Sequence, residues 1–297
     1  MFGNKGLLAL HASWTACSIY VPAHLGRFAL HLTAITLFAV KSLRGQARTT
    51  AHVEPWGLAG DRRYLVVDPQ GKFVTQRECP ALATLDAVPD GDGLTLTGAG
   101  LPPLGIAPPG LEAETLNVTV WRDSVTARRV GPSADAWLAA ALGRPCRLVY
   151  MDRPDRARPA DPAFARPEDR VSFADGFPLL IASSASLDDL NGRLVEPVGM
   201  DRFRANLVVA GAAPWAEDDW RHLRIGPVRF ETVKPCGRCI MTTTDQRSGA
   251  RHPGFEPIRT LQTFRRDRQG QVIFGQNLVP RSEGSVSVGD AVEVLAG

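Results

Sequence analysis

Short strand-like runs separated by turn residues recur along the chain and constrain its fold most strongly. Residues 32–40 are apolar and rich in β-branched residues, while residues 64–67 and 73–76 flank the turn sequence Asp68-Pro-Gln-Gly71. Alternating apolar and polar residues bounded by Gly and Pro are typical of half-buried strands joined by tight turns. The first half is therefore predicted to be mainly β, as a barrel or a sandwich.

Helices are expected to be few and short. Ser133 and Ser186 are expected to cap two of them, the first over residues 134–142, and Pro257 to open another. The proline-rich residues 153–162 have no apolar periodicity, which predicts a linker or a long loop. The expected fold class is α+β, mainly β with a few short helices.

Composition excludes several classes of protein. The 297 residues are 44% hydrophobic and 22% charged, with a formal net charge of +3, which is typical of a globular chain and not of a disordered or fibrous one. A dedicated nucleic-acid binder would concentrate basic residues in patches, and here they are scattered among a similar number of acids. No nucleic-acid partner is expected, and any cationic site must be local.

The N-terminal residues and the cysteines indicate the cellular location of the protein. Apolar stretches in the first thirty residues are broken by His and Pro well short of a membrane span. Residues 1–31 are expected to be a poorly ordered or mis-started extension, with a working export signal as the alternative. The five cysteines are an odd count at irregular spacings, unlike a secreted disulfide framework. A reducing, cytoplasmic location without a membrane span is therefore expected.

The sequence Cys236-Gly-Arg-Cys239 carries the most chemistry and admits four interpretations. A zinc site needs further ligands at suitable spacing, which the chain lacks. A redox pair should open a helix, but β-branched residues follow Cys239. Two half-buried thiols in a strand are the plainest alternative. A single thiolate bound to the metal of a larger cofactor is the fourth, with Lys234 and Arg238 supplying positive charge nearby.

The surrounding sequence resembles the MOSC family, in particular the bacterial YcbX proteins and the mitochondrial amidoxime-reducing component. The resemblance covers about residues 32–297 in consistent order and implies two parts. These are an N-terminal β-barrel-like domain over residues 32–150 and a MOSC β-barrel domain over residues 151–297. The matching stretches are residues 38–45, 60–67, 73–77, 172–191, 203–208, 233–245, 251–265, 274–277 and 288–290.

The resemblance implies a molybdenum cofactor (Mo-molybdopterin) and assigns residues to it. Cys239 matches the metal ligand, and Cys236 a less essential position. Asp175 falls where relatives carry an acidic residue near the metal, although Gly176 and Phe177 replace their small hydroxyl residues. Cys239 and Asp175 are thus the expected catalytic residues. The expected cofactor-binding residues share charge or hydrogen-bonding capacity suited to a phosphate and a pterin: Lys41, Ser42, Arg62, Arg204, Asn206 and Arg238.

The function implied is an oxidoreductase that reduces N-hydroxylated compounds, such as hydroxylamine-type base analogues and amidoximes. A protonated neighbour, either Asp175 or a metal-bound water, is expected to assist the leaving oxygen. Because no Cys-x₄-Cys-x₂-Cys spacing occurs, electrons are expected from a separate ferredoxin- or flavodoxin-type protein or a reductase.

Two alternatives stay open. One is a non-catalytic carrier of the cofactor, and the other is a sulfur carrier with a persulfide on Cys239. The pyridoxal-phosphate domain that would generate such sulfur in relatives is not found in this sequence.

Overall fold

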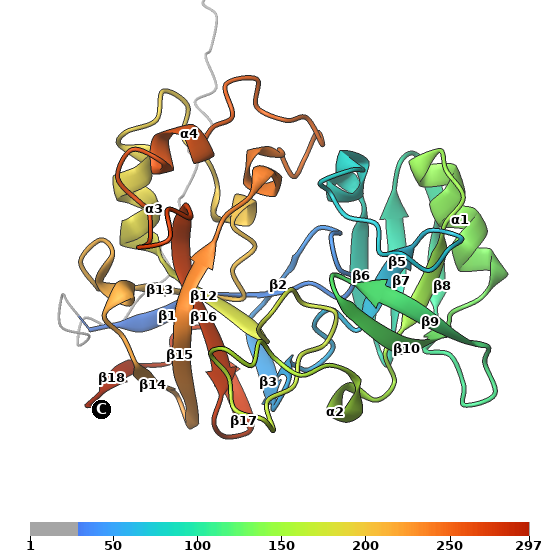
Figure 1. Ribbon diagram of the computed structural model, residues 1–297, viewed down its shortest axis with the longest axis horizontal. Helices are drawn as coiled ribbons and strands as arrows, with labels where there is room; N and C mark the ends of the chain where they lie inside the picture. The colour runs from blue at the N-terminus through green and yellow to red at the C-terminus, as the bar shows by residue number, and fades with distance from the viewer. Residues whose placement is uncertain (1–28, 297) are drawn as a thin grey trace, which may run out of the picture.

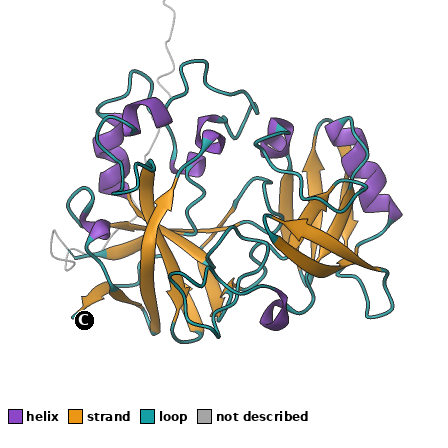
Figure 2. Cartoon of the chain, viewed as in Figure 1, coloured by secondary structure: helices purple, strands orange, loops and turns teal. Residues whose placement is uncertain are grey.

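Strands dominate the computed structural model, which describes residues 29–296 (Figures 1 and 2). The largest sheet has eight strands and combines both ends of the described chain. Their order across the sheet is β18 (Val292–Leu295), β14 (His222–Ile225), β15 (Val228–Gly237), β16 (Ile273–Pro280), β12 (Leu179–Ser183), β13 (Leu207–Ala210), β1 (His31–Leu37) and β2 (Gln46–Arg48).

Three smaller sheets complete the strand architecture. One packs with the large sheet and has the order β17 (Gly284–Ser287), β3 (Thr50–Glu54), β4 (Gly57–Leu58). The other two form the right-hand part of Figure 1. Their orders are β5 (Tyr64–Val67), β11 (Arg147–Tyr150), β10 (Asp123–Arg129), β9 (Thr115–Val120), and β6 (Asp86–Asp90), β7 (Gly93–Gly98), β8 (Leu101–Ile106).

The helices are short, and the predicted mainly β, α+β class is confirmed. Within residues 29–296 no helix is long and apolar enough to cross a membrane. The α-helices are α1 (Pro132–Leu142), α2 (Pro154–Ala157), α3 (Ser184–Asn191) and α4 (Ile258–Leu261), and the 3₁₀ turns are η1 (Pro80–Thr84), η2 (Met200–Arg202), η3 (Ala216–Asp218) and η4 (Ile240–Thr243).

Two predicted helix caps are wrong, and one helix start is confirmed. α1 begins before Ser133, at Pro132, because a proline at the first helical position needs no hydrogen bond for its nitrogen. Ser186 lies inside α3, where its hydroxyl donates to the buried carboxylate of Glu217 at 2.8 Å. Pro257 precedes α4, as predicted.

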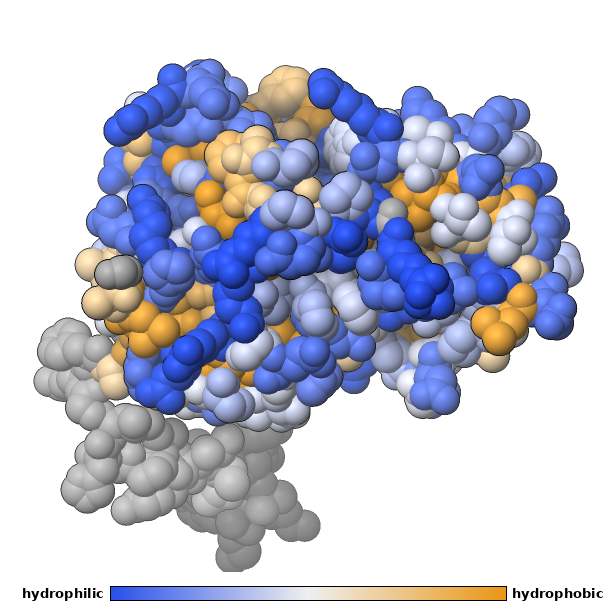
Figure 3. Space-filling model, turned by 60° about the horizontal axis from the view of Figure 1, so that its bottom comes forward, coloured by the Kyte–Doolittle hydropathy of each residue, from blue (hydrophilic) through white to orange (hydrophobic). Residues whose placement is uncertain are grey.

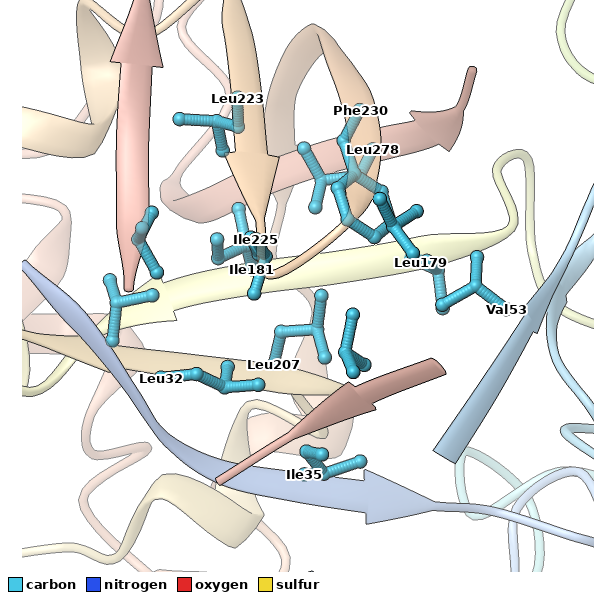
Figure 4. Close-up of a cluster of buried hydrophobic side chains, with 14 of the residues drawn as sticks. Leu32, Ile35, Val53, Leu179, Ile181, Leu207, Leu223, Ile225, Phe230 and Leu278 are labelled. Atoms are coloured by element: carbon cyan, nitrogen blue, oxygen red, sulfur yellow. The ribbon is translucent and has the colours of Figure 1, made fainter. Parts of the chain in front are cut away.

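Strands from the start of the chain complete the sheet built by its second half. β1 pairs antiparallel with β13, and β3 pairs antiparallel with β17. Their apolar side chains meet those of β12, β14, β15 and β16 in one buried cluster, part of which Figure 4 shows. The face of the molecule seen in Figure 3 is mostly hydrophilic, with apolar residues in small patches. β1, β3 and β4 therefore pack with the second half of the chain.

The expected division at residue 150 stays a prediction. Of the expected extension over residues 1–31, residues 1–28 lie outside the described part of the chain.

Three connections run between the two parts of the molecule, which lie left and right in Figure 1. Residues 38–45 leave β1, reach the right-hand part and return to β2, as the bond from Lys41 N to Tyr64 O (2.9 Å) shows. Residues 59–63 cross from β4 to β5, and residues 151–178 return from β11 to β12. Loops that cross between two packed bodies are well placed to form a site between them.

A buried carboxylate, Asp61, ties these connections together. Its Oδ1 accepts hydrogen bonds from Phe38 N (2.8 Å) and Asn206 Nδ2 (3.1 Å), and its Oδ2 pairs with Arg62. Its carbonyl accepts a bond from Ser172 Oγ (3.0 Å). Asp61 is 2% exposed, and a buried charge is tolerated only when it is paired and hydrogen-bonded. We call Asp61, Arg62 and Asn206 the junction network.

Asp61→Ala is expected to lower the free energy of unfolding by about 3–5 kcal/mol, because Arg62 would keep its charge in a largely buried position without its partner. Urea denaturation followed by circular dichroism measures the change. Asp92→Ala is the matched control, since Asp92 is exposed in a turn, and should change stability by no more than about 0.5 kcal/mol. Equal effects of the two substitutions would contradict the role of the junction network.

Candidate functional site

A cavity of about 240 Å³ opens where the three connections meet. All eight residues predicted as catalytic or cofactor-binding line it, although they span almost two hundred positions of sequence. They are Lys41, Ser42, Arg62, Asp175, Arg204, Asn206, Arg238 and Cys239. The structure therefore brings the predicted residues together. Their individual roles toward a cofactor stay predictions.

The two cysteines of the Cys236–Cys239 pair differ in their surroundings. Cys236 Sγ accepts a hydrogen bond from Arg238 Nη1 at 2.8 Å. Cys239 is also half-buried, but its sulfur makes no hydrogen bond within the part of the chain described. Arg238 was expected to lie beside the ligand thiol, and its guanidinium engages the other cysteine. The geometry leaves Cys239 as the thiol available to a ligand in the cavity.

Backbone geometry places this pair at the end of a strand. β15 loses regular register with β16 between Pro235 and Gly237, and Cys239 directly precedes η4. A Cβ at Gly237 would lie 2.2 Å from the side chain of Gln271, so only glycine fits without a shift of Gln271. Over residues 29–296 no group of three or more His, Cys, Asp or Glu side chains could hold a metal ion. A zinc site formed by the protein alone is therefore unsupported in the described part of the chain.

An ion pair crosses the cavity from Lys41 to Asp175. Lys41 Nζ lies 2.5 Å from Asp175 Oδ1, and the Lys41 side chain is 6% exposed while that of Asp175 is 56% exposed. Burial lowers the pKa of Lys41 to about 8, although Asp175 opposes the shift. Desolvation raises the pKa of Asp175, but the charge and hydrogen bond of Lys41 outweigh it and hold that pKa below its usual range.

These directions favour an ionised Asp175 with the proton of the pair on Lys41. The expected proton donor, either Asp175 or a metal-bound water, stays a prediction.

Two guanidinium groups share one aromatic ring beside the cavity. Arg62 Cζ lies 4.4 Å and Arg204 Cζ 4.2 Å from the ring centroid of Phe38. Arg204 Nη1 donates to Leu43 O at 2.8 Å. Burial and the nearby charge of Arg62 lower the pKa of Arg204, yet a guanidinium keeps its proton in proteins. This positive charge is only partly compensated, so a bound anion would stabilise it.

The side chain of Asn206 makes its hydrogen bonds within the protein. Its Oδ1 accepts bonds from Arg62 Nη1 (3.0 Å) and Leu180 N (3.3 Å). Its Nδ2 donates to Thr36 O and Asp61 Oδ1, both at 3.1 Å. The side chain is 1% exposed and uses both donors and both acceptor positions internally. The hydrogen bonds thus indicate that Asn206 positions Arg62, and direct contact with a cofactor stays a prediction.

Three of the seven non-glycine residues with positive φ angles within residues 29–296 line the cavity. Ser42, Arg62 and Arg204 have φ angles of 71°, 48° and 56°, in the left-handed region that favours glycine. Such residues cost about 1–3 kcal/mol each and persist where the surrounding structure fixes them, often at functional sites. Here the strained positions coincide with three of the residues predicted to bind a cofactor.

Several residues that line or support the cavity carried no role in the sequence interpretation. Arg77 belongs to a stretch that resembles the family, but nothing in its local pattern marked it as a site residue. Arg158 lies in the expected linker, yet it is 3% exposed and donates to the carbonyls of Ser172, Ala174 and Asp175. It therefore shapes the loop that carries Asp175. The other residues missed are Arg202, Met241, Thr242, Gln271 and Asn277.

The lining fits a polar, anionic cofactor. Six cationic side chains and one carboxylate line it: Lys41, Arg62, Arg77, Arg202, Arg204 and Arg238 with Asp175. Arg62 and Arg202 also pair with Asp61 and Asp245, and a phosphate would reduce the positive charge that remains. Arg202 Nη1 and Arg238 Nε are buried without a partner among residues 29–296. Unsatisfied buried donors at a cavity are explained when a ligand accepts from them. A thiolate from Cys239 suits a soft metal carried by such a cofactor.

Comparison with known proteins identifies the family of the chain. The model of the MOSC domain matches residues 168–293, and that of the MOSC N-terminal beta barrel domain matches residues 29–145. The chain is 29% identical to the molybdenum cofactor sulfurase of Oryza sativa subsp. japonica over 83% of its own length and 32% of that protein.

The amidoxime-reducing components match over most of their length. The chain is 35% identical to mitochondrial amidoxime-reducing component 1 of Homo sapiens, over 87% of its own length and 81% of that protein. The corresponding protein of Mus musculus is 34% identical, over 87% and 80%. The chain therefore belongs to the MOSC family, in the two-part form with an MOSC N-terminal β-barrel domain.

Proposed function

We propose that this protein is a molybdenum-cofactor enzyme that reduces N-hydroxylated compounds with electrons from a separate ferredoxin- or flavodoxin-type protein or a reductase. The observation that carries the proposal is the half-buried thiol of Cys239, unpartnered within residues 29–296, in a cavity with six cationic side chains. Identity of 35% with a human amidoxime-reducing component supports the substrate class. The free thiols Cys79, Cys146, Cys236 and Cys239 support a reducing, cytoplasmic location.

The protein would hold the cofactor at two places. Cys239 would bind the metal, while Lys41, Arg62 and Arg204 would bind the phosphate and pterin. The bound cofactor supplies the two-electron chemistry. The overall reaction takes an N-hydroxylated substrate, two electrons and two protons to the corresponding N–H compound and water, with cleavage of the N–O bond.

The Lys41–Asp175 pair would manage a proton in this reaction. Lys41 Nζ holds a proton at neutral pH and has a pKa of about 8, close to the working range of a general acid. Asp175 Oδ1 orients that ammonium group at 2.5 Å. Lys41 would deliver a proton to the leaving oxygen, and water would restore it.

A sulfur-carrier role is the second candidate. The observation that favours it is the 29% identity with a molybdenum cofactor sulfurase. In that role Cys239 would carry a persulfide, and the isolated protein would contain sulfane sulfur in place of molybdenum.

Cys239→Ser is expected to reduce molybdenum content by at least about tenfold, because even residues that only support metal ligands cost 10–100-fold in affinity when changed. Elemental analysis of the purified protein measures it. Cys236→Ser is the matched control and should retain molybdenum, since Cys236 is held by Arg238. Equal molybdenum in wild type and Cys239→Ser would contradict the assignment, and persulfide on Cys239 would favour the sulfur carrier.

Cofactor-loaded wild-type protein is expected to convert benzamidoxime or N-hydroxylated adenine to the N–H compound when a chemical reductant replaces the natural donor. Chromatography of the products measures turnover. The metal-depleted protein is the control and should be inactive. Full molybdenum loading without turnover would contradict the reductase proposal and favour a cofactor carrier.

Anion affinity of the cofactor-free protein is expected to fall about tenfold between pH 7 and 9, because Lys41 loses its positive charge as the pH rises through about 8. Sulfate is the probe, since its charge is constant over this range, and calorimetry measures its binding. Lys41→Gln should bind more weakly at pH 7 and lose the pH dependence, while exposed Lys72→Gln should behave as wild type. A pH dependence of sulfate binding in Lys41→Gln equal to that of the wild type would contradict the role of Lys41 in anion binding.

A further inference from the structure

Trp121 is a bulky aromatic residue at a backbone position that favours glycine. It is the first of two residues in the turn between β9 and β10, and its φ angle is 58°. Arg122, the second, is not among the residues with positive φ, an arrangement found in type II′ hairpin turns, where glycine usually stands first. The side chain is 45% exposed, so burial in the core does not explain this strained placement.

The contacts of Trp121 point to the mouth of the cavity. Its Nε1 donates to Asp175 Oδ1 at 3.1 Å. The Cζ of Arg77 lies 4.6 Å from its ring centroid, and the ring of Phe73 meets it edge-on at 5.1 Å. Trp121 itself is not part of the cavity lining, but Arg77 and Asp175 both are. The hairpin turn thus places Trp121, stacked with Arg77, at the rim of the cavity. We call these two residues the rim platform.

We propose that the rim platform, Arg77 and Trp121, binds the conjugated ring of the substrate by stacking and so favours aromatic over small aliphatic N-hydroxylated compounds. This inference rests on the proposed reductase function and specifies its substrate class. Indole rings and guanidinium planes both stack on flat π systems, and such contacts tolerate different rings.

Asp175 adds a polar contact beside the platform. Its Oδ1 is already engaged by Lys41 and Trp121, whereas its Oδ2 has only a loose pairing with Arg77 Nη2 at 3.8 Å. Because the side chain is 56% exposed, Oδ2 can accept a hydrogen bond from a ligand. The amino group of an amidoxime, or an N–H group of a purine base, is a suitable donor. A ring on the platform and an N–H group on Oδ2 would direct the N–O bond into the cavity.

Selectivity between two amidoximes tests the inference. Benzamidoxime and acetamidoxime share the reacting group and differ in the aromatic ring. Trp121→Ala should weaken the binding of benzamidoxime about tenfold and leave that of acetamidoxime nearly unchanged, since stacking on an aromatic side chain contributes roughly that much. Calorimetric binding to the cofactor-loaded protein is measured first, followed by the ratio of the two kcat/KM values.

Two further variants separate stacking from support of Asp175. Trp121→Phe keeps an aromatic face but loses the Nε1 bond to Asp175, so it should retain most of the selectivity. Trp56→Ala is the matched control, because Trp56 also stands in a two-residue hairpin turn, between β3 and β4, and bonds only to Glu54 through its Nε1. It should leave both ligands unaffected.

The outcomes distinguish this inference from the proposed function. If Trp121→Ala weakens both amidoximes equally, or Trp121→Phe behaves like Trp121→Ala, Trp121 acts through Asp175 and the stacking role is overturned. Loss of ring selectivity in binding supports the rim platform even where the wild type shows no turnover, a result that would refute only the reductase proposal.

Discussion

The buried carboxylate of Asp61 is the contact on which the arrangement of the site depends. A charge removed from water is stable only when other groups replace the lost hydration, and here those groups come from separate parts of the chain. Phe38 N, Arg62, Asn206 Nδ2 and Ser172 Oγ converge on this one residue. Because the partners belong to the three connections and to Asn206, which directly precedes β13, satisfying Asp61 also determines where those connections lie.

The junction explains why the site can hold so much positive charge. Six cationic side chains around one cavity repel one another with only one lining carboxylate among them, and three lining residues have left-handed backbone conformations. A protein selected for stability alone would avoid both features. The same surplus is favourable once a phosphate-bearing ligand is bound, so the strain is consistent with a site organised in advance for an anion. The fold contributes the rigidity, and the ligand would contribute the missing charge.

Much of the fold was predictable from sequence because strands and turns have local signals. The run at residues 64–67 is β5, and Asp68 closes the following turn by accepting bonds from Gln70 N and Lys72 N. The pairing of β1 with β13 was not predictable from such signals, since apolar alternation shows that a strand has a buried face but not which strand lies beside it.

Prediction of the candidate site from sequence was limited in the same way. Residue types and family motifs indicated the eight lining residues, but not what each side chain contacts. The amide side chain of Asn206 is of a type that often contacts ligands. Only its four hydrogen bonds within the protein indicate that it positions Arg62. Arg238 follows Cys236 and precedes Cys239, and sequence cannot tell which thiol it meets. Trp121 gave no signal at all, because a positive φ angle is a property of the folded backbone.

In the proposed site, Cys239 alone supplies the protein's bond to the metal. X-ray absorption at the molybdenum edge tests it most directly, because it counts the sulfur neighbours of the metal. Wild type and Cys236→Ser should show one sulfur neighbour more than Cys239→Ser, in which whatever molybdenum remains should have lost the cysteine sulfur. An unchanged sulfur count in Cys239→Ser, or a loss in Cys236→Ser, would contradict the account.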